Sequence, residues 1–290
     1  MLYSSAADWK NATHKRVALF GMSGLGKTHI SNLLRDEGDW FHYSVDFRIG
    51  TRYMGEHIVD NFKREAMRIP FLRDLLRTDS IYIASNITFN NLAPLSTYLG
   101  KPGDPDKGGI PFKEYIRRQR QHREAEIAAM LDTAHFIEKA IDIYGYGHFI
   151  CDTSGSVCEV VNTENPDDPV MQSLSTVALP VWIRGSDAHT ENLVARFRKA
   201  PKPMYYPEEF LRQKWDEYRS ETRLAEDQVD PDDFITWGYR ALLQNRLPRY
   251  EAIARNWGIT VEADEISAIR GEKDFTDLIA TAIERSPRNT

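Results

Sequence analysis

Short apolar runs recur along the chain, and each leads into a polar or glycine-containing loop. The first run, Arg16–Phe20, is rich in strand-forming residues. After its loop, His29–Leu34 carries apolar residues at helical spacing. Further apolar runs predict strands at Trp40–Asp46, His148–Cys151 and Val177–Ile183. Helical segments at Ile116–Ile143 and Pro207–Ala225 alternate with them, which predicts an α/β fold with a parallel sheet covered on both faces.

One long stretch interrupts this alternation. Residues 55–110 contain helical patterns and end in the proline- and glycine-rich sequence Lys101–Gly109, which predicts a flexible loop. We interpret 55–110 as a large helical insertion in a single domain that spans 1–290. A later acidic loop, Asp227–Asp233, is expected to cap a helix that begins near Phe234.

The loop after the first strand fits the pattern G-x-x-x-x-G-K-[ST] and lies between a predicted strand and a predicted helix. Its glycines let backbone N–H groups converge on phosphate, Lys27 reaches the β- and γ-phosphate oxygens, and the Thr28 hydroxyl binds Mg²⁺. The sequence therefore predicts the three-layer α/β/α sandwich of P-loop NTPases, with ATP and Mg²⁺ as ligands. The expected nucleotide-binding residues are Gly21, Ser23, Gly24, Leu25, Gly26, Lys27, Thr28 and His29.

Asp152 follows the strand at 148–151 and is a candidate second Mg²⁺ ligand. Aspartates at strand ends also cap the following helix, so this alternative stays open. A P-loop by itself does not separate hydrolases, switches and kinases, since all three classes share it.

Several segments resemble those of shikimate kinases, in the same order along the chain. Residues Tyr239–Ala254 resemble the family's R-x-P-x-Y segment, which is followed by a strand at Ile259–Glu262 and a last helix at Phe275–Glu284. Upstream, Val181–Ile183, Leu193–Arg196 and Lys202–Met204 resemble its strand, L-x-x-R helix and lid. The resemblance implies a kinase of this superfamily, including its gluconate and nucleoside monophosphate kinases.

The resemblance also implies roles for individual residues. Arg196 would lie near the adenine, and a lid-like segment at 196–206 would bring Lys202 to the transferred phosphate in place of the family's arginine. Asp46 would bind the acceptor hydroxyl and take its proton. The implied acceptor-binding residues are Asp46, Arg123, Gly155 and Arg246.

The chain departs from the family at two places. Ser44 replaces the magnesium-associated aspartate, which leaves Asp152 as its substitute, and Ser154-Gly155-Ser156 stands where the family has three glycines. Arg123, Arg246 and the basic residues at 196–202 also fit solvated helix surfaces without a ligand.

Composition limits the partners. The 290 residues carry a net charge of −6 with a pI near 5.8, which disfavours broad capture of nucleic acid or of an anionic membrane, although local patches remain open. Only Cys151 and Cys158 are present, too few for a disulfide framework. No apolar run approaches the ~20 residues that span a bilayer. We expect a cytoplasmic protein without a membrane segment.

Three functions fit these residues. The leading hypothesis is ATP-dependent phosphoryl transfer, catalysed by Lys27, Asp46 and Lys202, to a hydroxyl of a small anionic metabolite. The alternative is a P-loop ATPase or nucleotide-dependent switch that binds a protein partner through the insertion. A third is a polynucleotide-end kinase with a groove formed by the arginines of 117–123, which the acidic total disfavours.

Overall fold

The structure is a computed structural model and describes residues 2–286. Its centre is a five-stranded sheet in the order β2-β3-β1-β4-β5, and every neighbouring pair is parallel. This confirms the α/β class and the parallel sheet. The strands are β1 (Arg16–Phe20), β2 (Trp40–Ser44), β3 (His148–Asp152), β4 (Leu179–Arg184) and β5 (Ile259–Glu262).

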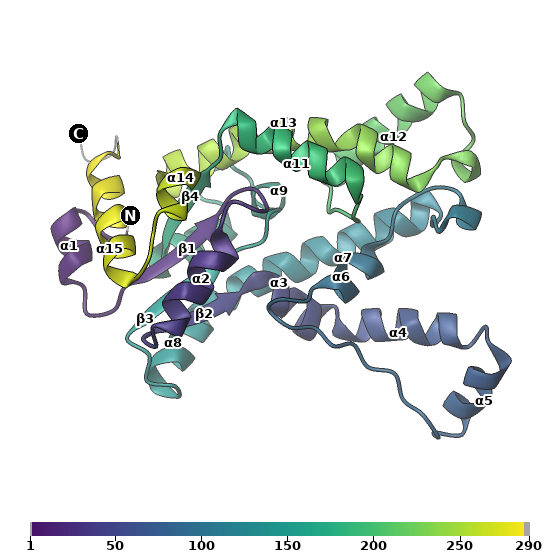
Figure 1. The fold of residues 1–290 in the computed structure, drawn as a ribbon, viewed down its shortest axis with the longest axis horizontal. Coiled ribbons are helices and arrows are strands. Elements are labelled where there is room, and N and C mark those ends of the chain that lie inside the picture. The colour runs from purple at the N-terminus through teal and green to yellow at the C-terminus, as the bar shows by residue number, and fades with distance from the viewer. Residues whose placement is uncertain (1, 287–290) are drawn as a thin grey trace. The chain divides into compact units, whose positions relative to one another are not determined.

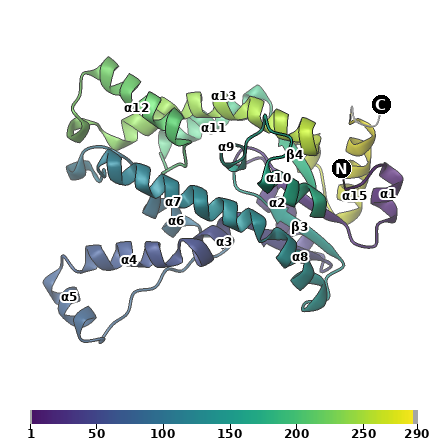
Figure 2. The same cartoon turned by 180° about the vertical axis from the view of Figure 1, so that it is seen from behind.

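Helices cover both faces of the sheet, as Figures 1 and 2 show from opposite sides. One face carries α2 (Lys27–Asp36) and α15 (Glu272–Glu284), and the other carries α8 (Thr133–Asp142) and α10 (Pro169–Val177). Because both faces are covered, β1 and β3 are buried along their length after the first residue. These three layers place the carboxyl ends of the central strands beside the P-loop.

The described chain divides into two compact units. The first comprises residues 2–45, 126–200 and 238–286 and contains the whole sheet. The second comprises Asp46–Ala125 and Pro201–Trp237, so it contains the whole 55–110 insertion. The single domain expected over 1–290 stays a prediction.

The first unit also holds shorter helices. They are α1 (Ala6–Asn11), α9 (Val157–Val160), α11 (Asp187–Lys199) and α14 (Ala263–Ser267), together with the C-terminal parts of α7 (Phe112–Leu131) and α13 (Pro231–Trp257).

The second unit is helical. Its elements are α3 (Val45–Arg48, from Asp46 on), a π-helical turn (Ile49–Tyr53), α4 (Gly55–Ala66), α5 (Pro70–Arg77), α6 (Ala93–Leu99), α12 (Glu208–Thr222), two 3₁₀ turns (Pro105–Lys107 and Glu226–Gln228) and the N-terminal parts of α7 and α13. Its core includes Trp215, whose ring lies 4.7 Å from Phe112 and 4.8 Å from Phe234. No helix among residues 2–286 is long and apolar enough to cross a membrane.

Several element boundaries differ from those predicted, and Val177, expected to begin a strand, is the last residue of α10. The expected helix at 116–143 is two helices, which meet at Asp132. The strand expected at 40–46 ends at Ser44, because Ser44 pairs with Asp152, the last residue of its neighbour β3. The helix expected near Phe234 begins at Pro231, which suits a first helical position, and Asp230 accepts the N–H groups of the next turn as the acidic loop predicted.

Candidate functional site

The P-loop joins β1 to α2 in a conformation that depends on glycine. Gly21, Gly24 and Gly26 all have positive φ, at 137°, 82° and 95°. A β-carbon on Gly21 would lie 2.6 Å from the carbonyl oxygen of Ile183 on β4. The loop therefore has the backbone shape in which consecutive N–H groups can face phosphate at the N-terminus of α2.

Lys27 is folded onto the same loop. Lys27 is 7% exposed. Its ammonium group donates to the carbonyl oxygens of Gly21, at 3.0 Å, and Met22, at 3.1 Å. These carbonyls hold the charge in place at the mouth of the loop. Its four-carbon stem can swing from these oxygens to phosphate oxygens.

Thr28 and Asp152 meet at the end of β3. The Thr28 hydroxyl donates to Asp152 Oδ2 at 2.6 Å. Burial raises the pKa of Asp152, and the nearby charge of Lys27 and the bond from Thr28 oppose that rise. One hydroxyl and one carboxylate suit Mg²⁺, which takes its remaining ligands from water and phosphate. Residues 2–286 contain no trio of His, Cys, Asp or Glu side chains arranged for a metal.

His42 lies behind this pair on β2. Its Nε2 is 4.0 Å from Asp152 Oδ2, and its side chain is fully buried. Burial lowers the pKa of His42 to about 4, with a further contribution from Arg35, so the imidazole is neutral at pH 7. Sequence reasoning missed His42, and its only signal was a polar residue inside an apolar strand.

The turn Ser154–Ser156, after β3, is held from two sides. The carboxylate of Glu126 on α7 accepts hydrogen bonds from the hydroxyls of Ser154 and Ser156, the latter at 2.8 Å. The Tyr250 hydroxyl on α13 donates to the Gly155 carbonyl. A β-carbon on Gly155 would be 3.6 Å from the backbone nitrogen of Ser23, so the turn lies directly beside the P-loop. The polar groups of this turn are held by protein partners.

Arg246 lies in the interior behind this turn. It forms an ion pair with Glu159 on α9, with 2.6 Å between Nη2 and Oε2, and the two side chains are 3% and 0% exposed. Burial raises the pKa of Glu159, and the charge of Arg246 opposes that rise. Glu159 was not identified from the sequence, although a single carboxylate in the apolar run Val157–Val160 was a signal. The acceptor role of Arg246 stays a prediction.

Arg196 borders a pocket beside the P-loop. Its Nη1 would be 3.6 Å from a β-carbon on Gly24. The pocket has a volume of about 400 Å³ and is lined by Gly24, Leu25, His189, Asn192, Leu193, Ala195, Arg196 and Lys199. Its position next to the phosphate loop suits a nucleotide base, and the role of Arg196 there stays a prediction.

The other candidate residues belong to the second unit. Asp46 is half-buried on α3, Arg123 is exposed on α7, and Lys202 is exposed in the coil after α11. The end of the lid-like segment is anchored within this unit, because Met204 O accepts from the Tyr115 hydroxyl at 3.0 Å and from Gln119 Nε2 at 3.2 Å. The acceptor and catalytic roles of Asp46, Arg123 and Lys202 stay predictions.

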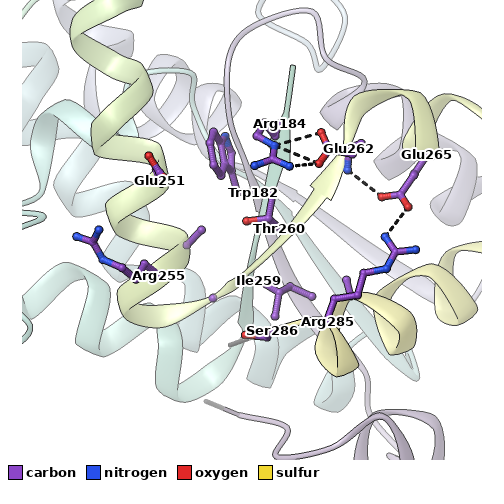
Figure 3. Close-up of a pocket in the computed structure, with 13 residues that line it drawn as sticks. Trp182, Arg184, Glu251, Arg255, Ile259, Thr260, Glu262, Glu265, Arg285 and Ser286 are labelled. Atoms are coloured by element: carbon purple, nitrogen blue, oxygen red, sulfur yellow. Dashed lines mark hydrogen bonds and ion pairs between the residues drawn. The ribbon is translucent and has the colours of Figure 1, made fainter. Parts of the chain in front are cut away.

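A second cavity, of about 430 Å³, lies along β5 (Figure 3). Two ion pairs border it, between Arg184 and Glu262 and between Arg285 and Glu265. Trp182 lines it and also approaches the P-loop, since its Cδ1 would be 3.4 Å from a β-carbon on Gly21.

Comparison with known proteins finds likeness only among solved structures. No family model matches the chain, and no curated protein matches it. Three chains among the solved structures match. One is the 1.7 Å crystal structure of shikimate kinase from Bacteroides thetaiotaomicron, at 14% sequence identity and a TM-score of 0.39, with 93% of this chain and 95% of that chain covered. A likeness this distant does not identify a substrate or a reaction for this chain.

Proposed function

We propose that the chain binds Mg·ATP on its P-loop and transfers the γ-phosphoryl group to a hydroxyl of a small, anionic metabolite. The observation that carries this proposal is the contact between Thr28 and Asp152, at 2.6 Å, at the start of a helix preceded by a glycine-dependent loop. A hydroxyl and a carboxylate at that position are the protein ligands that a nucleotide-bound Mg²⁺ needs. Bound Mg²⁺ would neutralise charge on the phosphate oxygens.

The residues of the loop act mainly by positioning. Backbone N–H groups of 21–28 would hold the β-phosphate, and Lys27 would exchange its carbonyl partners for phosphate oxygens. Asp46 would orient the acceptor hydroxyl and take its proton as the acceptor oxygen bonds to phosphorus and the bond to the ADP oxygen breaks. Arg123 would hold the acceptor anion, and Lys202 would offset charge on the transferred group. We assign Arg246 a structural role that links α13 to α9, because Glu159 on α9 already engages its guanidinium.

Two measurements test the proposal. Calorimetric titration with Mg·ATP should give saturable binding, and ADP release should rise by at least about tenfold when the correct acceptor from a panel of hydroxylated acids is added. Lys27→Ala should abolish turnover with a modest loss of nucleotide affinity. Asp46→Asn should keep nucleotide binding and lose transfer. Absence of Mg·ATP binding by folded protein would refute the proposal.

A second candidate is a nucleotide-dependent switch. It is favoured by Ser44, which stands opposite Asp152 in the sheet and supplies no second carboxylate. ATP turnover that no metabolite stimulates, together with normal nucleotide binding, would support the switch over the kinase.

A further inference from the structure

The segment Met67–Tyr82 of the second unit, here called the α5 tip, exposes large apolar side chains. Four of the eight exposed large hydrophobic residues among residues 2–286 lie in it: Met67, Ile69, Phe71 and Tyr82. Phe71 is 71% exposed and Tyr82 is 89% exposed, and α5 contains no buried residue. Figures 1 and 2 both draw α5 beyond the end of α4, away from α6 and α7. Such a concentration of apolar surface marks an interaction site.

The sequence of α5 separates apolar and charged residues by face. At 100° per residue, the apolar residues Phe71, Leu72, Leu75 and Leu76 fall within one stripe of the helix. Arg73, Asp74 and Arg77 fall on the opposite side. The helix is therefore amphipathic. Within residues 2–286, no element covers its apolar face closely enough to bury a side chain.

The charge of this region is opposite to that of the whole chain. The α5 tip carries three cations and two carboxylates, and the end of α4 before it adds Lys63 and Arg64 against Glu65, whereas the chain carries −6. Lys63, Arg68 and Arg73 have a carboxylate within 4 Å, at 3.4, 2.6 and 3.7 Å. Arg64 and Arg77 have no ion pair within the part of the chain that the structure describes. Two tips of this charge repel each other, which disfavours pairing with a second copy through this face.

We propose that the α5 tip docks the protein on an anionic membrane surface. Phe71 and Leu75 insert at the boundary between headgroups and acyl chains, and the arginines on the other side contact anionic headgroups. A projecting helix with apolar residues on one side and unpaired arginines nearby suits a fluid interface, which can deform around it. The docking is peripheral and independent of the proposed phosphoryl transfer.

Vesicle flotation of the full chain tests this inference. At ~50 mM salt, we expect at least about tenfold stronger binding to phosphatidylcholine vesicles that contain phosphatidylglycerol than to pure phosphatidylcholine vesicles. Binding should fall several-fold at ~500 mM salt because the headgroup charges are screened. Equal binding to both vesicle types, or none to either, overturns the proposal.

Variants identify the surface. The double variant Phe71→Glu/Leu75→Glu should lose vesicle binding by about tenfold or more while keeping its circular dichroism and its nucleotide titration. The matched control is Ile143→Glu, which changes an exposed apolar residue of the first unit and should bind as the wild type does. Unchanged binding by the double variant overturns the proposal. A wild-type dimer that becomes monomeric in the double variant, without vesicle binding, assigns the face to a second copy instead.

Discussion

Gly21 shows how little room the P-loop leaves around its backbone. It combines a φ of 137° with a carbonyl oxygen 2.6 Å from where a side chain would begin. Gly145 also has positive φ, at 69°, but a β-carbon there would meet nothing within 4 Å. Substitution of the two glycines therefore distinguishes the free-energy cost of the backbone conformation, present at both, from the cost of a steric clash, present only at Gly21.

We expect Gly21→Ala to lower the free energy of unfolding by about 2–4 kcal/mol, because strain and clash act together. Gly145→Ala should cost about 1 kcal/mol from conformation alone. Urea denaturation of both variants measures the difference. Equal losses would mean that the loop relaxes around the new methyl group.

Motif residues were predictable at this level, whereas their partners were not. Lys27 and Thr28 follow from a local pattern that fixes their chemistry. Glu159 and Arg246 are 87 residues apart in sequence and come together only in the folded chain, so no local spacing predicts the pair. The resemblance identified the arginine but not the carboxylate that holds it.

The buried pair joins α9 to α13, and its loss tests how much these elements depend on it. Glu159→Gln should cost about 3–5 kcal/mol of unfolding free energy, because it removes the carboxylate that pairs with the buried Arg246 charge. Replacing both residues by methionine should cost less than the single change. A double-mutant cycle from thermal or urea unfolding gives the coupling energy, and an additive result would show that the pair is not coupled.

A second link between elements joins α7 to α12. Glu208 accepts two hydrogen bonds from Arg120, at 2.6 and 2.7 Å, and these bonds and the neighbouring Arg212 lower the pKa of Glu208 to about 2. A carboxylate with a lowered pKa stabilises the fold above its ordinary pKa of 4.5, and that contribution is lost as the pH falls toward 2.

Glu208→Gln should therefore be less stable than the wild type at pH 7, by up to about 1 kcal/mol because the pair is partly solvated. The gap should close as the pH falls from 4.5 toward 2. Denaturation across this pH range measures it, and a gap that widens in acid would contradict the assignment.

Element boundaries followed local sequence only where local chemistry decided them. Asp230 and Pro231 start α13 as a capping residue followed by proline. The end of β2 depends instead on the last residue of β3 that can pair with it, and the sequence of β2 does not contain that information. The division into α7 and α8 has no glycine or proline at Asp132 to announce it.

At the level of the whole molecule, the sequence predicted the type of sheet and the net charge, but neither the order of the strands nor the local distribution of charge. The alternation of strands and helices predicted a parallel sheet, but the order β2-β3-β1-β4-β5 is a property of the complete fold. A net charge of −6 averages over the chain and so conceals the basic α5 tip.

Both cysteines report on opening of the fold. Cys151 and Cys158 are fully buried, and burial raises the pKa of each thiol. We expect no reaction with an aromatic disulfide reagent in native buffer on the timescale in which two thiols react in denaturant. A fast reaction of one equivalent in native buffer would show local opening at β3, which carries Cys151, or at α9, which carries Cys158.

Trp182 gives the P-loop an intrinsic optical reporter. Its indole ring approaches Gly21, Trp182 also lines the β5 cavity, and the residue is 5% exposed. Phosphate entering the loop should shift its emission, and Trp182→Phe should remove most of that shift although five other tryptophans remain. Ligand affinities could then be read from the unlabelled protein by fluorescence.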